Sequence, residues 1–178
     1  MDRTTKTATM AAAFMMAAAG NASAQDLYSE RLPLHLELSL SAQTPYKGLI
    51  PFGAEIDLNY GFKRFSIHAV ANEDYFIPKE SVTKNYNRVF NLGGGVGFEL
   101  FPRKANDHSV FEARLSVTTS IGSGAYTNTS YKIGIDWHAW RSSIGITPTI
   151  GIGYNLKDFS KSFMPTYHGG YLTFGIRF

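Results

Sequence analysis

The sequence predicts an all-β protein, an eight-stranded antiparallel up-and-down barrel, and two observations lead to this fold class. Apolar and polar residues alternate with a period of two in eight successive runs, which is the pattern of strands with one apolar and one polar face. The chain ends on one of these runs. It contains no cysteine, so disulfides and cysteine-based metal sites are excluded.

The first 24 residues are typical of a secretory signal peptide. Arg3 and Lys6 precede the apolar stretch 8–19, and the small residues Ala22, Ser23 and Ala24 follow it. We expect cleavage before Gln25. The mature part, residues 25–178, is then predicted to be a single barrel domain. Removal of Arg3, Lys6 and Asp2 leaves 15 basic and 13 acidic residues out of 17 and 14, and a net charge of about +2 gives no reason to expect a nucleic-acid partner.

Each of the eight runs shows the same alternation. In the first, Leu34, Leu36, Leu38 and Leu40 alternate with His35, Glu37 and Ser39. The runs cover residues 34–40, 52–60, 65–72, 90–100, 111–121, 131–139, 144–154 and 171–178.

The connections between the runs form a second pattern. They are 41–50, 61–64, 73–88, 101–109, 122–129, 140–142 and 155–169, so longer and shorter connections roughly alternate. Such alternation is typical of a barrel with long loops at one end and tight turns at the other. Pro148 lacks the N–H group that a central strand needs, and we therefore expect a bulge near residues 147–149.

The period alone does not say which face points inward, because a soluble sandwich and a soluble ligand-binding barrel have the same alternation. Aromatic residues on the apolar face favour a transmembrane barrel, since they collect in two groups near opposite strand ends. One group is Phe65, Phe111, Trp137 and Phe178, and the other is Phe52, Phe90, Tyr131 and Tyr154.

The polar face carries acids and bases together with many small residues, which suits a narrow lumen filled by side chains. Charges in such a lumen require partners. We therefore predict a lumen charge network of Glu37, Asp57, Glu99, Glu112, Arg114, Lys132, Asp136 and Arg177. Charged rings also select ions in pores, so a narrow gated ion channel is the alternative hypothesis.

With its signal peptide, its strand number and its terminal aromatic strand, the chain from Leu34 to Phe178 resembles the small OmpA/OmpX-type outer-membrane barrels of Gram-negative bacteria. The resemblance implies a multi-pass protein of the cell outer membrane. It also implies that Leu172, Phe174, Ile176 and Phe178 form the signal read by the outer-membrane assembly machinery, although Thr173 stands where such strands often have glycine. Outer-membrane lipid or lipopolysaccharide would surround a monomer.

A catalytic role is the third hypothesis, because some small outer-membrane barrels modify lipid A. The sequence offers Ser66, His68, Ser116, Asp136 and His138 on the inward face, and Asp158, Ser160, Ser162 and His168 in the connection 155–169. The inward residues would point away from lipid acyl chains, so we expect no enzyme. The five histidines lie on separate elements without metal-ligand spacing, and we expect neither a metal nor a cofactor. A structural or surface-interaction role, such as adhesion or envelope integrity, is the favoured hypothesis.

Overall fold

A computed structural model describes residues 34–46, 48–62, 64–78, 87–101, 109–124, 126–139, 146–160 and 166–178. It contains eight strands in one closed barrel. They are β1 (Leu34–Gln43), β2 (Leu49–Phe62), β3 (Phe65–Pro78), β4 (Asn87–Glu99), β5 (Val110–Ser120), β6 (Asn128–His138), β7 (Thr147–Phe159) and β8 (Tyr167–Arg177). The predicted signal peptide, residues 1–24, lies outside the described residues. No helix in the described part of the chain is long and apolar enough to cross a membrane.

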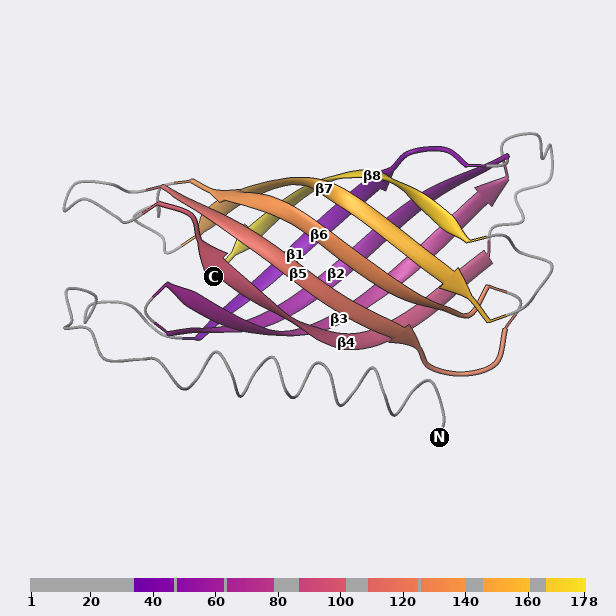
Figure 1. The fold of residues 1–178 in the computed structure, drawn as a ribbon, viewed down its shortest axis with the longest axis horizontal. Coiled ribbons are helices and arrows are strands. Elements are labelled where there is room, and N and C mark those ends of the chain that lie inside the picture. The colour runs from indigo at the N-terminus through magenta and orange to yellow at the C-terminus, as the bar shows by residue number, and fades with distance from the viewer. Residues whose placement is uncertain are drawn as a thin grey trace. The chain divides into compact units, whose positions relative to one another are not determined.

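Every strand pairs antiparallel with its neighbours in the sequence, and β8 pairs with β1 to close the barrel (Figure 1). The predicted eight-stranded antiparallel barrel is therefore confirmed. Following the paired residues once around from Leu34 leads to Gly170, whose carbonyl accepts a hydrogen bond from the N–H of Thr44. The register thus shifts by ten residues, from 34 to 44. Such a stagger tilts the strands across the barrel axis, as Figure 1 shows.

The alternation of apolar and polar residues in the sequence corresponds to side chains that point alternately out of the barrel and into its lumen. In β1, Leu36, Leu38 and Leu40 are 40%, 38% and 53% exposed, whereas Glu37 and Ser41, at odd-numbered positions of the same strand, are 3% and 4% exposed. The same holds for the other strands: most buried side chains are polar or charged, and the exposed large side chains are apolar. The polar face therefore points into the lumen.

The strands are longer than the sequence pattern predicted near one end of the barrel. Residues 73–78 continue β3, residues 155–159 continue β7, and β8 begins at Tyr167. The connections expected at 73–88 and 155–169 are therefore wrong at their boundaries, because the strands on either side extend into them. The connection expected at 41–50 is likewise shorter and covers residues 44–48. We call this end of the barrel the loop end. The opposite end, where β1 begins and β8 finishes, is called the termini end.

The expected bulge at Pro148 is also wrong. Thr147, Pro148 and Thr149 pair in continuous register with β8. In an antiparallel strand the N–H and C=O groups of one residue face the same neighbour, and the carbonyl of Pro148 accepts a hydrogen bond from Ala139, just beyond the end of β6. The N–H group that proline lacks would therefore point towards Ala139, where β6 has already ended. The hydrogen bonds between β7 and β8 do not need this group and are unaffected.

Aromatic side chains lie on the outer face near both ends of the barrel. Phe65, Phe111 and Phe178 are more than 40% exposed at the termini end. Phe52, Phe90, Tyr131 and Tyr154 are exposed towards the loop end. Between these two groups the outer face carries mainly leucine and isoleucine, so the barrel has an apolar band with an aromatic rim at each side.

Candidate functional site

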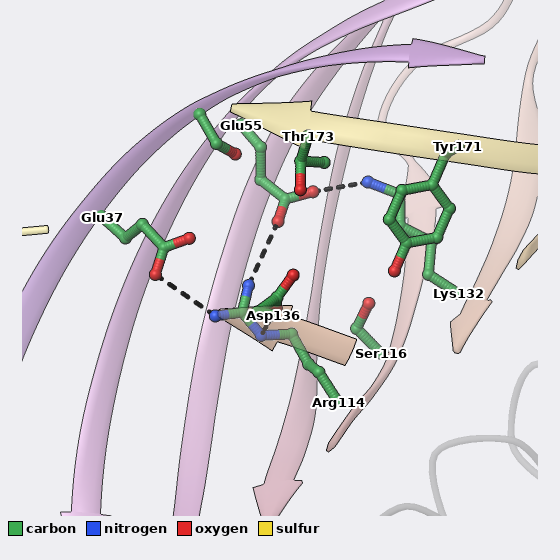
Figure 2. A pocket seen from close by; sticks show the side chains of 9 residues that line it. Glu37, Glu55, Arg114, Ser116, Lys132, Asp136, Tyr171 and Thr173 are labelled. Atoms are coloured by element: carbon green, nitrogen blue, oxygen red, sulfur yellow. Dashed lines mark hydrogen bonds and ion pairs between the residues drawn. The ribbon is translucent and has the colours of Figure 1, made fainter. Parts of the chain in front are cut away.

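Arg114, on β5, is the centre of a charge cluster in the half of the lumen nearer the termini end. Its guanidinium lies 3.0 Å from a carboxylate oxygen of Asp136, 3.2 Å from Asp57 and 3.3 Å from Glu37. Glu55 lies 4.0 Å away. These carboxylates come from β1, β2 and β6, so one side chain links distant strands across the lumen (Figure 2). The planar guanidinium suits this role because it presents five donors.

Glu112 forms a second centre on the same strand. One of its oxygens accepts a hydrogen bond from Arg177 at 3.2 Å and contacts His138 at 2.9 Å. Its other oxygen lies 3.2 Å from His68 and accepts a hydrogen bond from Ser66. Arg177 also donates to Glu37 at 3.0 Å. Glu37 therefore joins the Arg114 and Glu112 centres into one network.

Lys132, on β6, links β6 to β2 across the middle of the lumen, because its ammonium donates a hydrogen bond to Glu55 at 2.5 Å. A cavity of about 10 Å³ remains beside this pair, which is about the space that one water molecule needs. Its lining residues are shown in Figure 2 and comprise Glu37, Ser39, Glu55, Arg114, Ser116, Lys132, Asp136, Tyr171 and Thr173. Side chains therefore fill this section of the lumen.

A separate ion pair lies nearer the loop end. The ammonium of Lys157 is 2.6 Å from Asp74, and the amide of Asn91 donates to the same carboxylate oxygen at 2.9 Å. Both charged side chains are fully buried. The ring of Phe76 packs against the ammonium at 5.3 Å and stacks on Tyr126 at 5.1 Å, with Phe159 at 5.7 Å. We call these three rings the aromatic plug.

All eight residues of the predicted charge network lie on the inward face. The structure brings seven of them into the ion pairs described above. Glu99 is partly exposed near the termini end, and its main-chain carbonyl accepts a hydrogen bond from Arg64 at 2.7 Å. Sequence reasoning missed Asp74 and Lys157, because it placed both in loops. The unbroken alternation through Asn155 and Lys157 is the signal that could have found them.

The four residues predicted as an assembly signal all point outward. Leu172, Phe174, Ile176 and Phe178 are between 38% and 55% exposed. The N–H of Phe178 bonds to the carbonyl of Leu36. The last residue is therefore held against β1, and its side chain belongs to the aromatic rim.

Ser66, His68 and Asp57 have the outline of a hydrolase triad. The hydroxyl of Ser66 is 2.7 Å from Nε2 of His68, and Nδ1 of His68 is 2.8 Å from Asp57. However, an oxygen of Glu112 contacts both the Ser66 hydroxyl and Nε2 of His68. A carboxylate beside the hydroxyl opposes the oxyanion that acyl transfer develops, whereas catalysis requires hydrogen-bond donors there. The arrangement is therefore better suited to an ion-pair network than to catalysis.

The remaining catalytic candidates are not gathered into a site. Ser116 and Asp136 both line the small cavity, and His138 contacts Glu112. Asp158 and His168 lie on the outward faces of β7 and β8 rather than in a loop, and Ser160 lies beyond the end of β7. Ser162 lies outside the described residues. Among the described side chains, no group of three or more His, Asp or Glu is placed to hold a metal ion.

Together these features define a class of protein: a closed eight-stranded barrel with a charged, side-chain-filled interior and an apolar exterior. A solved structure of the same architecture is that of Neisserial surface protein A, which is 14% identical in sequence and matches with a TM-score of 0.50 over 81% of this chain and 94% of that one. This likeness shows a shared fold. No family model and no curated protein matches the sequence.

Proposed function

We propose that this chain is an integral outer-membrane β-barrel protein with a structural or surface-interaction role, such as adhesion or envelope integrity. The observation that carries the proposal is the reversed distribution of polarity. Charged side chains are buried, whereas apolar side chains cover the outer face of the strands. An apolar band of this extent is unusual on a protein in water, but it is what a lipid bilayer requires.

Closure of the barrel supports the same proposal. A strand edge in lipid would leave N–H and C=O groups without partners, and only helices and closed barrels avoid this. Here β8 pairs with β1 from Glu37 to Gln43, so no edge remains along that seam. The two aromatic rims fit the two interfaces of a bilayer.

The location and the partners form the finer part of the proposal. A signal peptide at residues 1–24 would direct export, and the outward Leu172, Phe174, Ile176 and Phe178 on the last strand would be read by the assembly machinery. Lipid or lipopolysaccharide of the outer membrane would then surround a monomer. The similar barrel from Neisseria is named as a surface protein, which supports a role at the cell surface for this chain.

The membrane assignment predicts a protein that needs detergent. In detergent micelles, the purified protein should give a β-rich circular dichroism spectrum and should migrate differently on gels before and after boiling, because an intact barrel resists unfolding by dodecyl sulfate. A chain that stays monomeric and soluble without detergent would rule out the proposal.

The ion-channel alternative has less support. The network around Arg114 and Glu112, the small cavity and the aromatic plug fill the lumen at successive levels. In planar bilayers we therefore expect no single-channel steps from the wild-type protein. The Phe76→Ala variant, which removes one ring of the aromatic plug, should also give none because the charge network below it remains. Regular conductance steps from the wild type would favour the channel instead.

A lipid-modifying enzyme is the third candidate, and only the triad-like contacts of Ser66, His68 and Asp57 resemble a catalytic arrangement among the described residues. The triad-like residues Ser66, His68 and Asp57 face the lumen and are engaged with Glu112 or Arg114. Mass spectra of lipid A from cells with and without the protein should be identical. A protein-dependent change in acylation would overturn this view.

A further inference from the structure

Charged residues on the outer face stand out because most charged side chains in the strands point inward. Within β1–β8, the outward acidic and basic residues are Glu73 on β3, Arg88 on β4 and Asp158 near the end of β7. Glu73 pairs along the backbone with Ala54 and Phe90, at the level of the aromatic rim of the loop end. At the level of a bilayer interface a lipid-facing charge costs much less than at the midplane, so a charged pair can be kept here and can meet lipid headgroups.

Glu73 and Arg88 are neighbours that remain open to the outside. One carboxylate oxygen of Glu73 lies 3.8 Å from the Arg88 guanidinium, and the other accepts a hydrogen bond from the hydroxyl of Tyr75 at 2.7 Å. Their side chains are 32% and 72% exposed. The contact is therefore loose, and each charge has room for a further partner of the opposite sign.

An apolar hollow of about 600 Å³ opens next to this pair. It lies on the outer face over β1, β2, β3, β4 and β8, and Glu73 is among its lining residues. The small side chains of Ala54 and Ala71 lie between the larger ones of Leu40, Phe90 and Phe174, all of which line the hollow. It is an open groove rather than an enclosed pocket, and its mainly apolar lining suits a hydrocarbon chain laid along the barrel wall.

We propose that the hollow and the Glu73–Arg88 pair bind one molecule of a zwitterionic phospholipid. The acyl chain would lie in the hollow, the phosphate would contact Arg88 and the ammonium would contact Glu73. The argument is charge complementarity, because an anionic lipid would satisfy Arg88 but would be repelled by Glu73, and an uncharged headgroup would satisfy neither. This inference rests on the proposed function in one respect, namely that the outer face lies in a membrane.

The test compares two lipids that differ only in the headgroup. The purified full-length protein in maltoside micelles is equilibrated with equal amounts of phosphatidylethanolamine and phosphatidylglycerol of the same acyl chains, and bound lipids are counted by native mass spectrometry. We expect about fivefold more bound phosphatidylethanolamine, the ratio expected from one exposed ion pair. Glu73→Gln should reduce this preference to about equal binding, because it removes the partner of the ammonium.

A second variant tests the hollow itself. Ala71→Leu fills the space for the acyl chain and should lower the binding of both lipids about tenfold. Ala113→Leu is the matched control, because Ala113 is also an outward alanine, on β5, but does not line the hollow. It should bind lipid as the wild type does.

Equal binding of the two lipids to the wild type, or unchanged binding to Ala71→Leu, would overturn the inference. Heat-dependent gel mobility of each sample establishes beforehand that the barrel is folded in the micelle. If that mobility shift is present and the lipid preference is absent, the lipid site fails while the proposed function stands. If the protein needs no detergent at all, the proposed function fails first.

Discussion

Replacing Arg114 with alanine is expected to lower the free energy of unfolding by about 3–5 kcal/mol, the usual cost of removing one partner from a buried ion pair. Arg114 is 8% exposed and is the shared partner of Asp57, Asp136 and Glu37. Without it these carboxylates would face one another in a section of the lumen where side chains leave a cavity of about 10 Å³. Urea unfolding of the refolded barrel, followed by tryptophan fluorescence, measures the change.

Arg88→Ala is the matched control for this measurement. It is the same substitution at an outward position, where the side chain is 72% exposed and its ion pair with Glu73 spans 3.8 Å. Exposed pairs of this kind contribute about 0–1 kcal/mol. Equal losses from the two variants would contradict the view that the Arg114 network holds the barrel together. Arg114→Lys should lose part of the stability, because an ammonium keeps the charge but cannot contact three carboxylates in the same plane.

The faces of the strands were predictable from the sequence because the side-chain period of a strand is two and the register keeps that period around the whole barrel. Leu38 and Glu37 illustrate this, since their opposite burial follows from adjacent positions alone. The same reasoning placed the charge network on the inward face. It failed at the strand ends, where the charged Asp74 and Lys157 stand in stretches that the sequence pattern assigned to loops.

The individual contacts of the network could not be predicted, because they depend on the stagger of the strands. Glu112 meets Ser66 and His68 across more than 40 positions of sequence, and the pairing of β3 with β4 and of β4 with β5, together with the tilt of the strands, sets these levels. No local pattern encodes that register. Glu73 is a related case, since its outward position follows from the alternation of β3 only once that strand is known to continue beyond Asn72.

Asp74→Ala is expected to destabilise the barrel by about 3–5 kcal/mol as well. The substitution leaves the Lys157 ammonium fully buried beneath the Phe76 ring without its counter-ion, and a buried unpaired charge is far more costly than an exposed one. Glu73→Ala is the control on the neighbouring residue. Its side chain points outward and is 32% exposed, so the loss should stay below about 1 kcal/mol.

The double variant Asp74→Ala, Lys157→Met separates the ion pair from the packing around it. The methionine side chain would keep an apolar stem against Phe76 without a charge, so the double variant should be more stable than Asp74→Ala alone. Contacting residues of this kind show interaction energies of about 0.5–3 kcal/mol, and a value near the upper end is expected because both charges are fully buried. Additive losses in the urea midpoints would instead mean that water reaches Lys157 and Asp74 from the loop end and that the aromatic plug does not seal the lumen.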